Sequence, residues 1–298
     1  MENKNTMTNE QLEAALSSYR SKATVARFLT YGSVAVMTLL FFTGMIPVAL
    51  IFLVLSFVGG YQLSKNTQAL KTLLGDNIIS GVLKEALGDA VKYDPMGRVR
   101  PGRMVFPFPY TKTDGSDHIW AVYRGLNIEL SDIELINEET DMDAEGNTQT
   151  SKTTFFKGQW LICDFGKELS GEVYLSERSR KDRSIMKSNV TMENDAFAKR
   201  FCVKADVPQE AYYILTPHMM EYITKMADRS GGTVYMSFQR DGKMHVAVKT
   251  GRDFFELGNS SADVESLRRK FCDELKWFTD IVDTLRVEDT LYIKEMNA

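Results

Sequence analysis

Residues 28–63 read FLTYGSVAVMTLLFFTGMIPVALIFLVLSFVGGYQL, a run that contains no charged side chain. About 20 apolar residues already cross the ~30 Å hydrocarbon layer of a membrane, so this run is too long for one ordinary span. Gly44 and Pro47 lie near its middle, where they favour a break between two helices. The run therefore predicts a transmembrane hairpin, with spans over residues 23–43 and 46–63. The alternative is a single long or re-entrant helix.

The charges beside the run predict its orientation. Arg20, Lys22 and Arg27 precede the first span, Lys65 and Lys71 follow the second, and the turn carries no charge. Because basic residues accumulate on the cytoplasmic side, we expect both termini and the main domain to be cytoplasmic. The predicted location is the cell inner (plasma) membrane, as a multi-pass protein in contact with the lipid bilayer.

Composition limits the function of the remaining chain. The mean hydropathy of the 298 residues is −0.23, so the part outside the hairpin is polar and a polytopic transporter is excluded. A net charge of −4 argues against nucleic-acid binding, which rests on an excess of Lys and Arg. Cys163, Cys202 and Cys272 are isolated, as is typical of free thiols in a reducing compartment, and they form no paired-cysteine metal motif.

Hydrophobic periodicity predicts an α+β protein with three parts: an N-terminal helix and transmembrane hairpin (1–64), an amphipathic helix and basic linker (65–105), and a cytoplasmic α+β domain (106–298). In the last part we expect a mixed, mainly antiparallel sheet packed with helices. The predicted strands are residues 119–123, 126–136, 153–164, 172–175, 233–238 and 244–249. Helices are predicted from Pro208, from Pro217 and, capped by Ser260 and Asp263, as a long C-terminal helix. The amphipathic helix is predicted over 67–89 and the linker over 92–103.

An acidic stretch, residues 137–151, is predicted to be a hairpin loop. Asp141, Asp143, Glu145 and Gly146 match the opening of a calcium-binding loop. The closing position is Lys152, a cation where a glutamate ligand is required, and the flanks are predicted strands. The sequence therefore predicts no metal site, and it contains no cofactor motif.

Two basic segments are the candidate contact sites. Because the domain is predicted to be attached to the cytoplasmic leaflet, the side chains of both segments are expected to contact anionic lipid or a membrane-protein partner. The alternative is that both are ordinary solvated loops. The candidate residues are Arg98, Arg100, Arg103, Arg178, Arg180, Lys181 and Arg183.

Catalytic motifs are not found in the sequence. There is no Gly-x-x-x-x-Gly-Lys-Ser/Thr loop, no His-Glu-x-x-His and no Gly-x-Ser-x-Gly, and His118, His218 and His245 each stand alone. A Cys163 nucleophile that meets a distant histidine stays open. The predicted function is a membrane-anchored cytoplasmic binding or scaffold module. The alternative is a membrane-tethered hydrolase with a cysteine-based or carboxylate-based site.

Five short motifs follow the hairpin in order: Phe156–Gly158, Glu193, Phe197, Phe201–Val203 and Ala211–Pro217. Together with the hairpin they make the chain resemble the bacterial membrane-anchored family called domain of unknown function 3137. The likeness extends over about residues 119–249. The resemblance implies a bacterial inner-membrane protein with a cytoplasmic α+β domain, and it supplies no activity and no catalytic residues. It also implies a LemA-type membrane protein as a partner.

Overall fold

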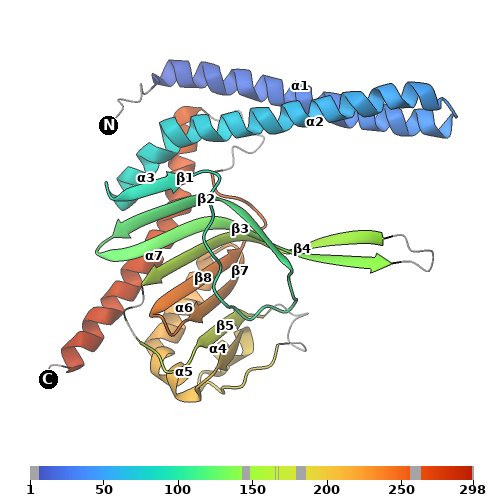
Figure 1. Cartoon of the computed structure of the whole chain (residues 1–298). Coiled ribbons are helices and arrows are strands. Elements are labelled where there is room, and N and C mark those ends of the chain that lie inside the picture. Colours follow the sequence, from blue (N-terminus) through green and yellow to red (C-terminus); the bar gives the residue numbers. More distant parts are fainter. Residues whose placement is uncertain are drawn as a thin grey trace. The chain divides into compact units, whose positions relative to one another are not determined.

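The computed structural model describes residues 7–142, 148–164, 166, 168–178, 186–255 and 263–296, with the side chains at 71, 76, 141 and 284–296 left out of the description (Figure 1). The chain divides into two compact units. The first contains residues 1–82 and 259–269, and the second contains residues 83–258 and 270–298. Each unit is described by itself below.

Two long helices, α1 (Asn9–Phe42) and α2 (Ile46–Leu74), form the hairpin of the first unit (Figure 1). The start of α1 is a capping box, in which Thr8 Oγ1 accepts from the Gln11 amide and Gln11 Oε1 accepts from the Thr8 amide. Gly44 has φ +76° in the turn, a backbone conformation that favours glycine. A Cβ atom at Gly59 would lie 2.6 Å from Thr30 Oγ1, so the close approach of the two helices depends on this glycine. Two helices joined at Gly44 were predicted, and both are present.

The predicted amphipathic helix over 67–89 is not a separate element. Its first turns belong to α2, which passes without interruption to Leu74 and continues as the π-helix η1 (Gly75–Ile79) and as α3 (Ser80–Leu87). Its apolar positions are buried as the periodicity predicted: Leu74, Ile78, Ile79, Val82, Leu83 and Leu87. The difference arises because nothing after residue 63 breaks the helix, and charged residues such as Lys65 are good helix formers.

An eight-stranded sheet forms the body of the second unit, with the strand order β1-β2-β3-β4-β8-β7-β5-β6. Every pairing between neighbours is antiparallel, which confirms the α+β class and the mainly antiparallel sheet that was predicted. The strands are β1 (Val91–Asp94), β2 (Lys112–Tyr123), β3 (Leu126–Met142), β4 (Thr148–Asp164), β5 (Val173–Glu177), β6 (Phe201–Ala205), β7 (Thr233–Phe238) and β8 (Lys243–Lys249).

Strand β1 takes up residues 92–94 of the predicted linker over 92–103, and the rest of the linker lies outside helices and strands as predicted. The four residues of β1 pair with β2, from Val91 opposite Ala121 to Asp94 opposite His118. Four residues are too few for a period of two to be recognised, and Lys92 and Pro95 made the segment look like a loop. Tertiary pairing with β2 makes it a strand.

The acidic stretch 137–151 was predicted to be a loop, and its described residues, 137–142 and 148–151, are strand instead. Strands β3 and β4 continue beyond the sheet as a two-stranded ribbon up to Met142 and from Thr148 (Figure 1). Glu138 lies opposite Lys152 in the ladder, and their side chains form an ion pair of 2.9 Å. Cross-strand pairs of this kind stabilise the ribbon, although its polar sequence predicted a loop. Residues 143–147, which hold Asp143, Glu145 and Gly146, lie outside the described residues.

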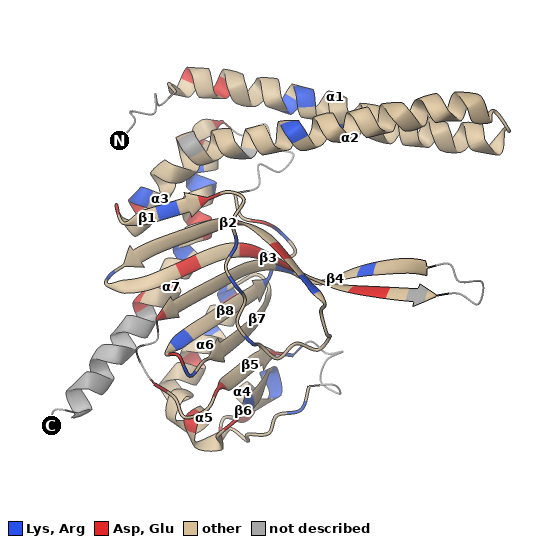
Figure 2. Ribbon diagram, in the orientation of Figure 1, with Lys and Arg blue, Asp and Glu red and all other residues tan. Residues whose placement is uncertain are grey.

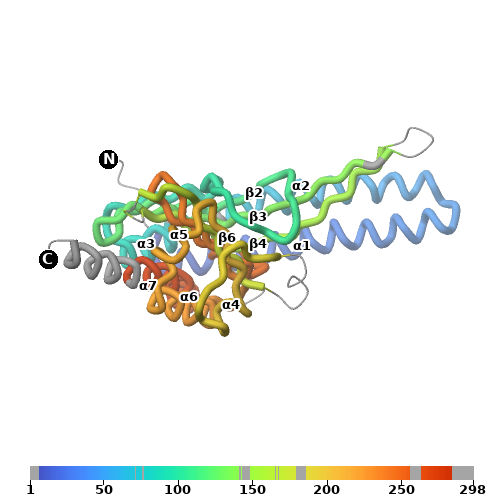
Figure 3. The backbone as a smooth tube through the Cα atoms, turned by 90° about the horizontal axis from the view of Figure 1, so that it is seen from below, coloured from blue at the N-terminus to red at the C-terminus, as the bar shows by residue number. Residues whose placement is uncertain are grey.

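Helices cover one face of the sheet. They are α4 (Asp195–Arg200), α5 (Pro208–Ile214), α6 (Pro217–Arg229) and α7 (Val264–Met296). Figure 3 shows α4, α6 and α7 on the same side of the strands. Arg229 of α6 donates to Asp280 of α7 at 2.7 Å. The helices predicted from Pro217 and at the C-terminus are thus confirmed. The long helix starts at Val264, directly after Asp263, whose carboxylate accepts from the Ser266 amide.

The other face of the sheet is crossed by the connection between β1 and β2, residues 95–111, here called the crossing segment (Figure 1). A core of aromatic side chains lies between this segment and the strands. The Phe106 ring is 4.8 Å from the Tyr235 ring and 5.4 Å from the Phe155 ring, measured between centroids. Phe156 and Trp160 of β4 belong to the same cluster and are fully buried. This packing fixes the position of the residues described next.

Candidate functional site

The crossing segment carries three of the predicted contact residues and is held to the sheet at several points. The Val99 amide donates to Ser131 Oγ of β3 at 3.1 Å, and the Val99 side chain is buried in the aromatic cluster. Ser176 Oγ of β5 donates to the carbonyl oxygen of Val105. A segment anchored in this way positions its outward side chains more precisely than a free loop does.

A hollow of about 520 Å³ lies at the start of the crossing segment, a volume within the range of ligand pockets. Its lining comes from the crossing segment and from the first residues of β2: Arg98, Val99, Arg100, Pro101, Tyr110 and Thr113. Two arginines and two residues with hydroxyl groups therefore line one space. This chemistry suits an anion.

The predicted basic residues have different surroundings. Arg98 and Arg100 line the hollow together. Arg103 lies 3.6 Å from Glu172 and is 80% exposed, so it is directed away from them. Arg178 donates to the Ala198 carbonyl oxygen at 3.3 Å and to Ser188 Oγ at 2.7 Å, as a structural side chain would. Arg180, Lys181 and Arg183 lie outside the described residues.

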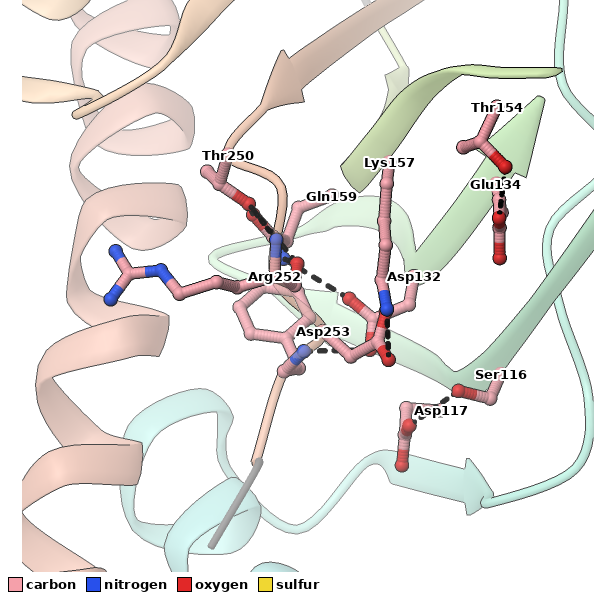
Figure 4. Close-up of polar contacts among 11 residues, drawn as sticks. Ser116, Asp117, Asp132, Glu134, Thr154, Lys157, Gln159, Thr250, Arg252 and Asp253 are labelled. Carbon is pink, nitrogen blue, oxygen red and sulfur yellow. Dashed lines mark hydrogen bonds and ion pairs between the residues drawn. The ribbon is translucent and has the colours of Figure 1, made fainter. Parts of the chain in front are cut away.

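A second polar cluster, which sequence reasoning missed, lies under the helix-covered face (Figure 4). The Asp132 carboxylate on β3 is 2% exposed and accepts from the Phe254 amide at 2.7 Å and from Gln159 Nε2 at 3.2 Å. Its pKa is raised well above the usual value, first by burial and then by the charges of Asp117 and Asp253. The one signal in the sequence was its spacing, because Asp132 follows Ile128 and Leu130 at intervals of two residues.

Asp117 forms the other half of this cluster at an irregularity in β2, where its φ is +59°. It is 3% exposed and accepts from Tyr93 Oη and from Ser116 Oγ. Burial and the neighbouring Asp117 carboxylate raise the pKa of Tyr93 far above that of a free phenol. Asp253 forms an ion pair of 3.0 Å with Lys157 nearby (Figure 4). The cluster ties strands β1 to β4 to the chain after β8, and its groups are held in a network that serves structure.

The histidine and cysteine positions bear on the hydrolase alternative. His245 of β8 lies opposite Ile162, whereas Cys163 lies opposite Met244. Since side chains alternate along a strand, Cys163 and His245 point to opposite faces of the sheet. His245 Nδ1 accepts from Trp160 Nε1 at 3.1 Å, and burial lowers its pKa to about 4. Here it acts as a neutral structural partner of the tryptophan.

His118 has a comparable role on β2. Its Nε2 lies 3.2 Å from Glu129, and its ring lies 3.5 Å from the Trp120 ring. Burial lowers its pKa, with Glu129 opposing that effect. His218 lies in the first turn of α6, where it was predicted. No group of three or more His, Cys, Asp or Glu side chains suited to a metal ion occurs among the residues that the structure describes.

Comparison with known proteins gives one match. Residues 154–287 match the model of a family described as "Protein of unknown function (DUF3137)". This segment runs from the middle of β4 into α7, so the hairpin and the arginine-lined hollow precede it. No curated protein and no solved structure matches the chain. The segment that begins in β4 and ends in α7 is therefore similar to the DUF3137 family of proteins of unknown function.

Proposed function

We propose that this protein is a membrane-anchored binding or scaffold module, with α1 and α2 as the anchor and the sheet domain as the binding part. The observation that carries the proposal is the exposure of large apolar side chains along the hairpin. Phe42 is 83% exposed, Phe57 is 72% exposed and Phe28 is 77% exposed. Apolar surface this extensive is typical of a helix that faces lipid.

Length and burial support an anchor over a core helix. Both α1 and α2 contain an apolar stretch long enough to cross a membrane, and 11% of that stretch is buried in each. The core helix of a soluble protein buries its apolar side chains, so it does not show this pattern. Figure 2 shows that Lys and Arg occur in the hairpin only toward its open end, and that the rest of both helices carries neither sign of charge.

The same charges support a cytoplasmic orientation for the sheet domain. Arg20, Lys22, Arg27 and Lys65 all flank the apolar stretches on the side of the open end. The positive-inside rule places that end in the cytoplasm, and in a bacterium the membrane is then the inner membrane. The family match is compatible with this proposal and adds no activity to it.

Binding is favoured over hydrolysis by the geometry of the described residues. The register places Cys163 and His245 on opposite faces of the sheet, and Asp132 is enclosed in a network of hydrogen bonds. The exposed polar chemistry lies instead in the arginine-lined hollow. A partner or ligand with negative charge, such as an anionic lipid or an acidic surface of another membrane protein, fits that hollow.

Reporter fusions test the anchor and its orientation. Full-length protein is fused at its C-terminus to green fluorescent protein or to alkaline phosphatase, and membranes are washed with alkaline carbonate. We expect carbonate-resistant membrane association, fluorescence from the first fusion and no phosphatase activity from the second. Release by carbonate contradicts the anchor, and phosphatase activity with intact membranes contradicts the orientation.

A further inference from the structure

We propose that the hollow lined by Arg98 and Arg100 is a binding site for a phosphate group carried by a ligand. The proposal names the ligand class of the binding module and rests on that proposed function for its membrane setting. The site itself is a property of the sheet domain, and the hairpin does not contribute to its lining.

The backbone around the hollow is arranged so that both arginines face it. Val99 lies between them and is 1% exposed, with its amide bonded to Ser131 Oγ. Because side chains alternate in extended backbone, the burial of Val99 directs Arg98 and Arg100 to the opposite, outer side. The fold therefore places both arginines at one hollow.

The residues after Arg100 restrict the position of the crossing segment on the sheet. Pro101 restricts φ directly after Arg100. Gly102 lies so close to β8 that a Cβ atom there would be 2.6 Å from His245 Cε1 and 2.1 Å from Gln239 Nε2. Because the neutral His245 ring is itself held by Trp160, this contact has a rigid support. Preorganisation of this kind lowers the ordering cost of binding an anion.

The charges of the hollow are available to a ligand. Among the described residues, no ion pair or hydrogen bond engages the Arg100 guanidinium. Arg98 has one acidic neighbour, Asp114, at 3.9 Å, with side-chain exposures of 47% and 60%. An exposed ion pair at that distance contributes little and is easily exchanged for a better anion. The nearby basic residues are engaged elsewhere, Lys112 with Glu138 and Arg103 with Glu172.

Two arginines favour a phosphate over a carboxylate. A phosphate monoester carries about −1.5 to −2 charges at neutral pH and three acceptor oxygens, which two guanidinium groups match with paired hydrogen bonds. A carboxylate carries a single charge and satisfies one arginine. Tyr110 and Thr113 contribute hydroxyl groups to the lining, and the Tyr110 ring is held 6.0 Å from Phe155. The hollow thus combines positive charge, hydroxyl donors and an aromatic ring that packs against its neighbour.

Direct titration tests this proposal. Full-length protein in a nonionic detergent is titrated with inorganic phosphate and with sodium acetate in a calorimeter. We expect saturable phosphate binding and much weaker acetate binding. Arg100→Gln and Arg98→Gln should each weaken phosphate binding about tenfold or more, as the loss of charge-assisted hydrogen bonds does. Asp114→Asn should tighten it, because the internal competitor of the ligand is removed.

Arg103→Gln is the matched control, since Arg103 belongs to the same segment, has the same charge and does not line the hollow. Equal weakening by Arg103→Gln and Arg100→Gln, or no saturable phosphate binding by the wild type, overturns the proposal. The thermal unfolding of each variant is measured alongside, and a variant that does not keep the wild-type transition is replaced by Arg100→Lys. That substitution keeps the charge and is still expected to weaken binding through loss of the paired geometry.

A second arm identifies the source of the phosphate. Short-chain phosphatidic acid is added to the micelles as a competitor of inorganic phosphate. Competition at lower concentration than inorganic phosphate assigns the site to a lipid headgroup, and preference for the soluble ion assigns it to a soluble phosphate compound. Phosphate binding without membrane association refutes the anchor alone, whereas membrane association without phosphate binding refutes the site alone.

Discussion

The helical hairpin and the sheet domain contain the same kinds of apolar side chain, but the hairpin exposes them and the sheet domain buries them. Phe57 of α2 is 72% exposed, whereas Phe156 of β4 is fully buried in the aromatic cluster. The polar groups of the two regions also differ in where they bond. Thr30 and Ser33 donate to carbonyl oxygens of their own helix, α1, whereas Asp132 is buried in a network between strands. This difference is the one expected if, as we propose, the hairpin lies in lipid and the sheet domain lies in water.

The largest expected effect compares one substitution in the two regions. Phe156→Ala should lower the free energy of unfolding by about 3–5 kcal/mol, because it opens a cavity among Trp160, Tyr235 and Phe106. Phe57→Ala removes the same atoms from an exposed position and should change it little. Thermal and chemical unfolding of the full chain in detergent measure both. Equal losses at the two positions would remove the distinction between the regions.

A charged residue placed in the hairpin tests the proposal that α2 faces lipid. Val54 of α2 lies near the middle of the predicted span 46–63 and is 61% exposed. Val54→Arg should cost about 2.5–3.5 kcal/mol of insertion free energy and reduce the fraction of protein in carbonate-washed membranes. In a water-soluble protein the same exposed substitution is nearly neutral. An unchanged membrane fraction would therefore count against α2 as a span.

Acid sensitivity should come from the sheet domain. His245 has a pKa of about 4 in the fold against 6.5 unperturbed, so the unfolded chain binds the proton more readily. Stability is then complete above pH 6.5 and falls as the pH decreases toward 4, by up to about 3 kcal/mol. His245→Gln should flatten this decline in unfolding experiments between pH 7 and pH 4. A variant with the wild-type decline would assign the acid sensitivity to other groups.

The ionisation of Asp132 should change stability with pH in the opposite direction to that of His245, and by less. The pKa of Asp132 is raised in the fold, so stability is complete below the unperturbed value of 3.8 and falls as the pH rises through the folded pKa. Asp132→Asn should lower the free energy of unfolding by about 1–3 kcal/mol, since it removes an acceptor from the Phe254 amide or from Gln159. The variant should also lose less stability with rising pH than the wild type. A slope identical to that of the wild type would show that Asp132 does not titrate as described.

Prediction from sequence succeeded where the signal was local. The helical hairpin, the long C-terminal helix and strands β7 and β8 follow from apolar runs, caps and alternation close together in the chain. It failed where the deciding contact was distant. Strand β1 exists because β2 pairs with it, and the ribbon of β3 and β4 exists because the two strands pair along its length.

The candidate site shows the same division. The sequence marked Arg98, Arg100, Arg103 and Arg178 as one class, because composition records charge and not direction. The fold separates them: Arg98 and Arg100 share a hollow, Arg103 lies near Glu172, and Arg178 is bonded to its neighbours. Asp117 and Asp132 were not recognised as a buried cluster, since β2 and β3 must pair before the two carboxylates approach.

By itself the sequence determined that a long apolar hairpin precedes a polar α+β domain, because apolar run length and helix or strand period are properties of neighbouring residues. Only the tertiary structure decided which arginines face a common space, which carboxylates leave water, and that Cys163 and His245 lie on opposite faces. The physical reason is that burial and the direction of a side chain are set by strand register and packing, which join residues far apart in the chain.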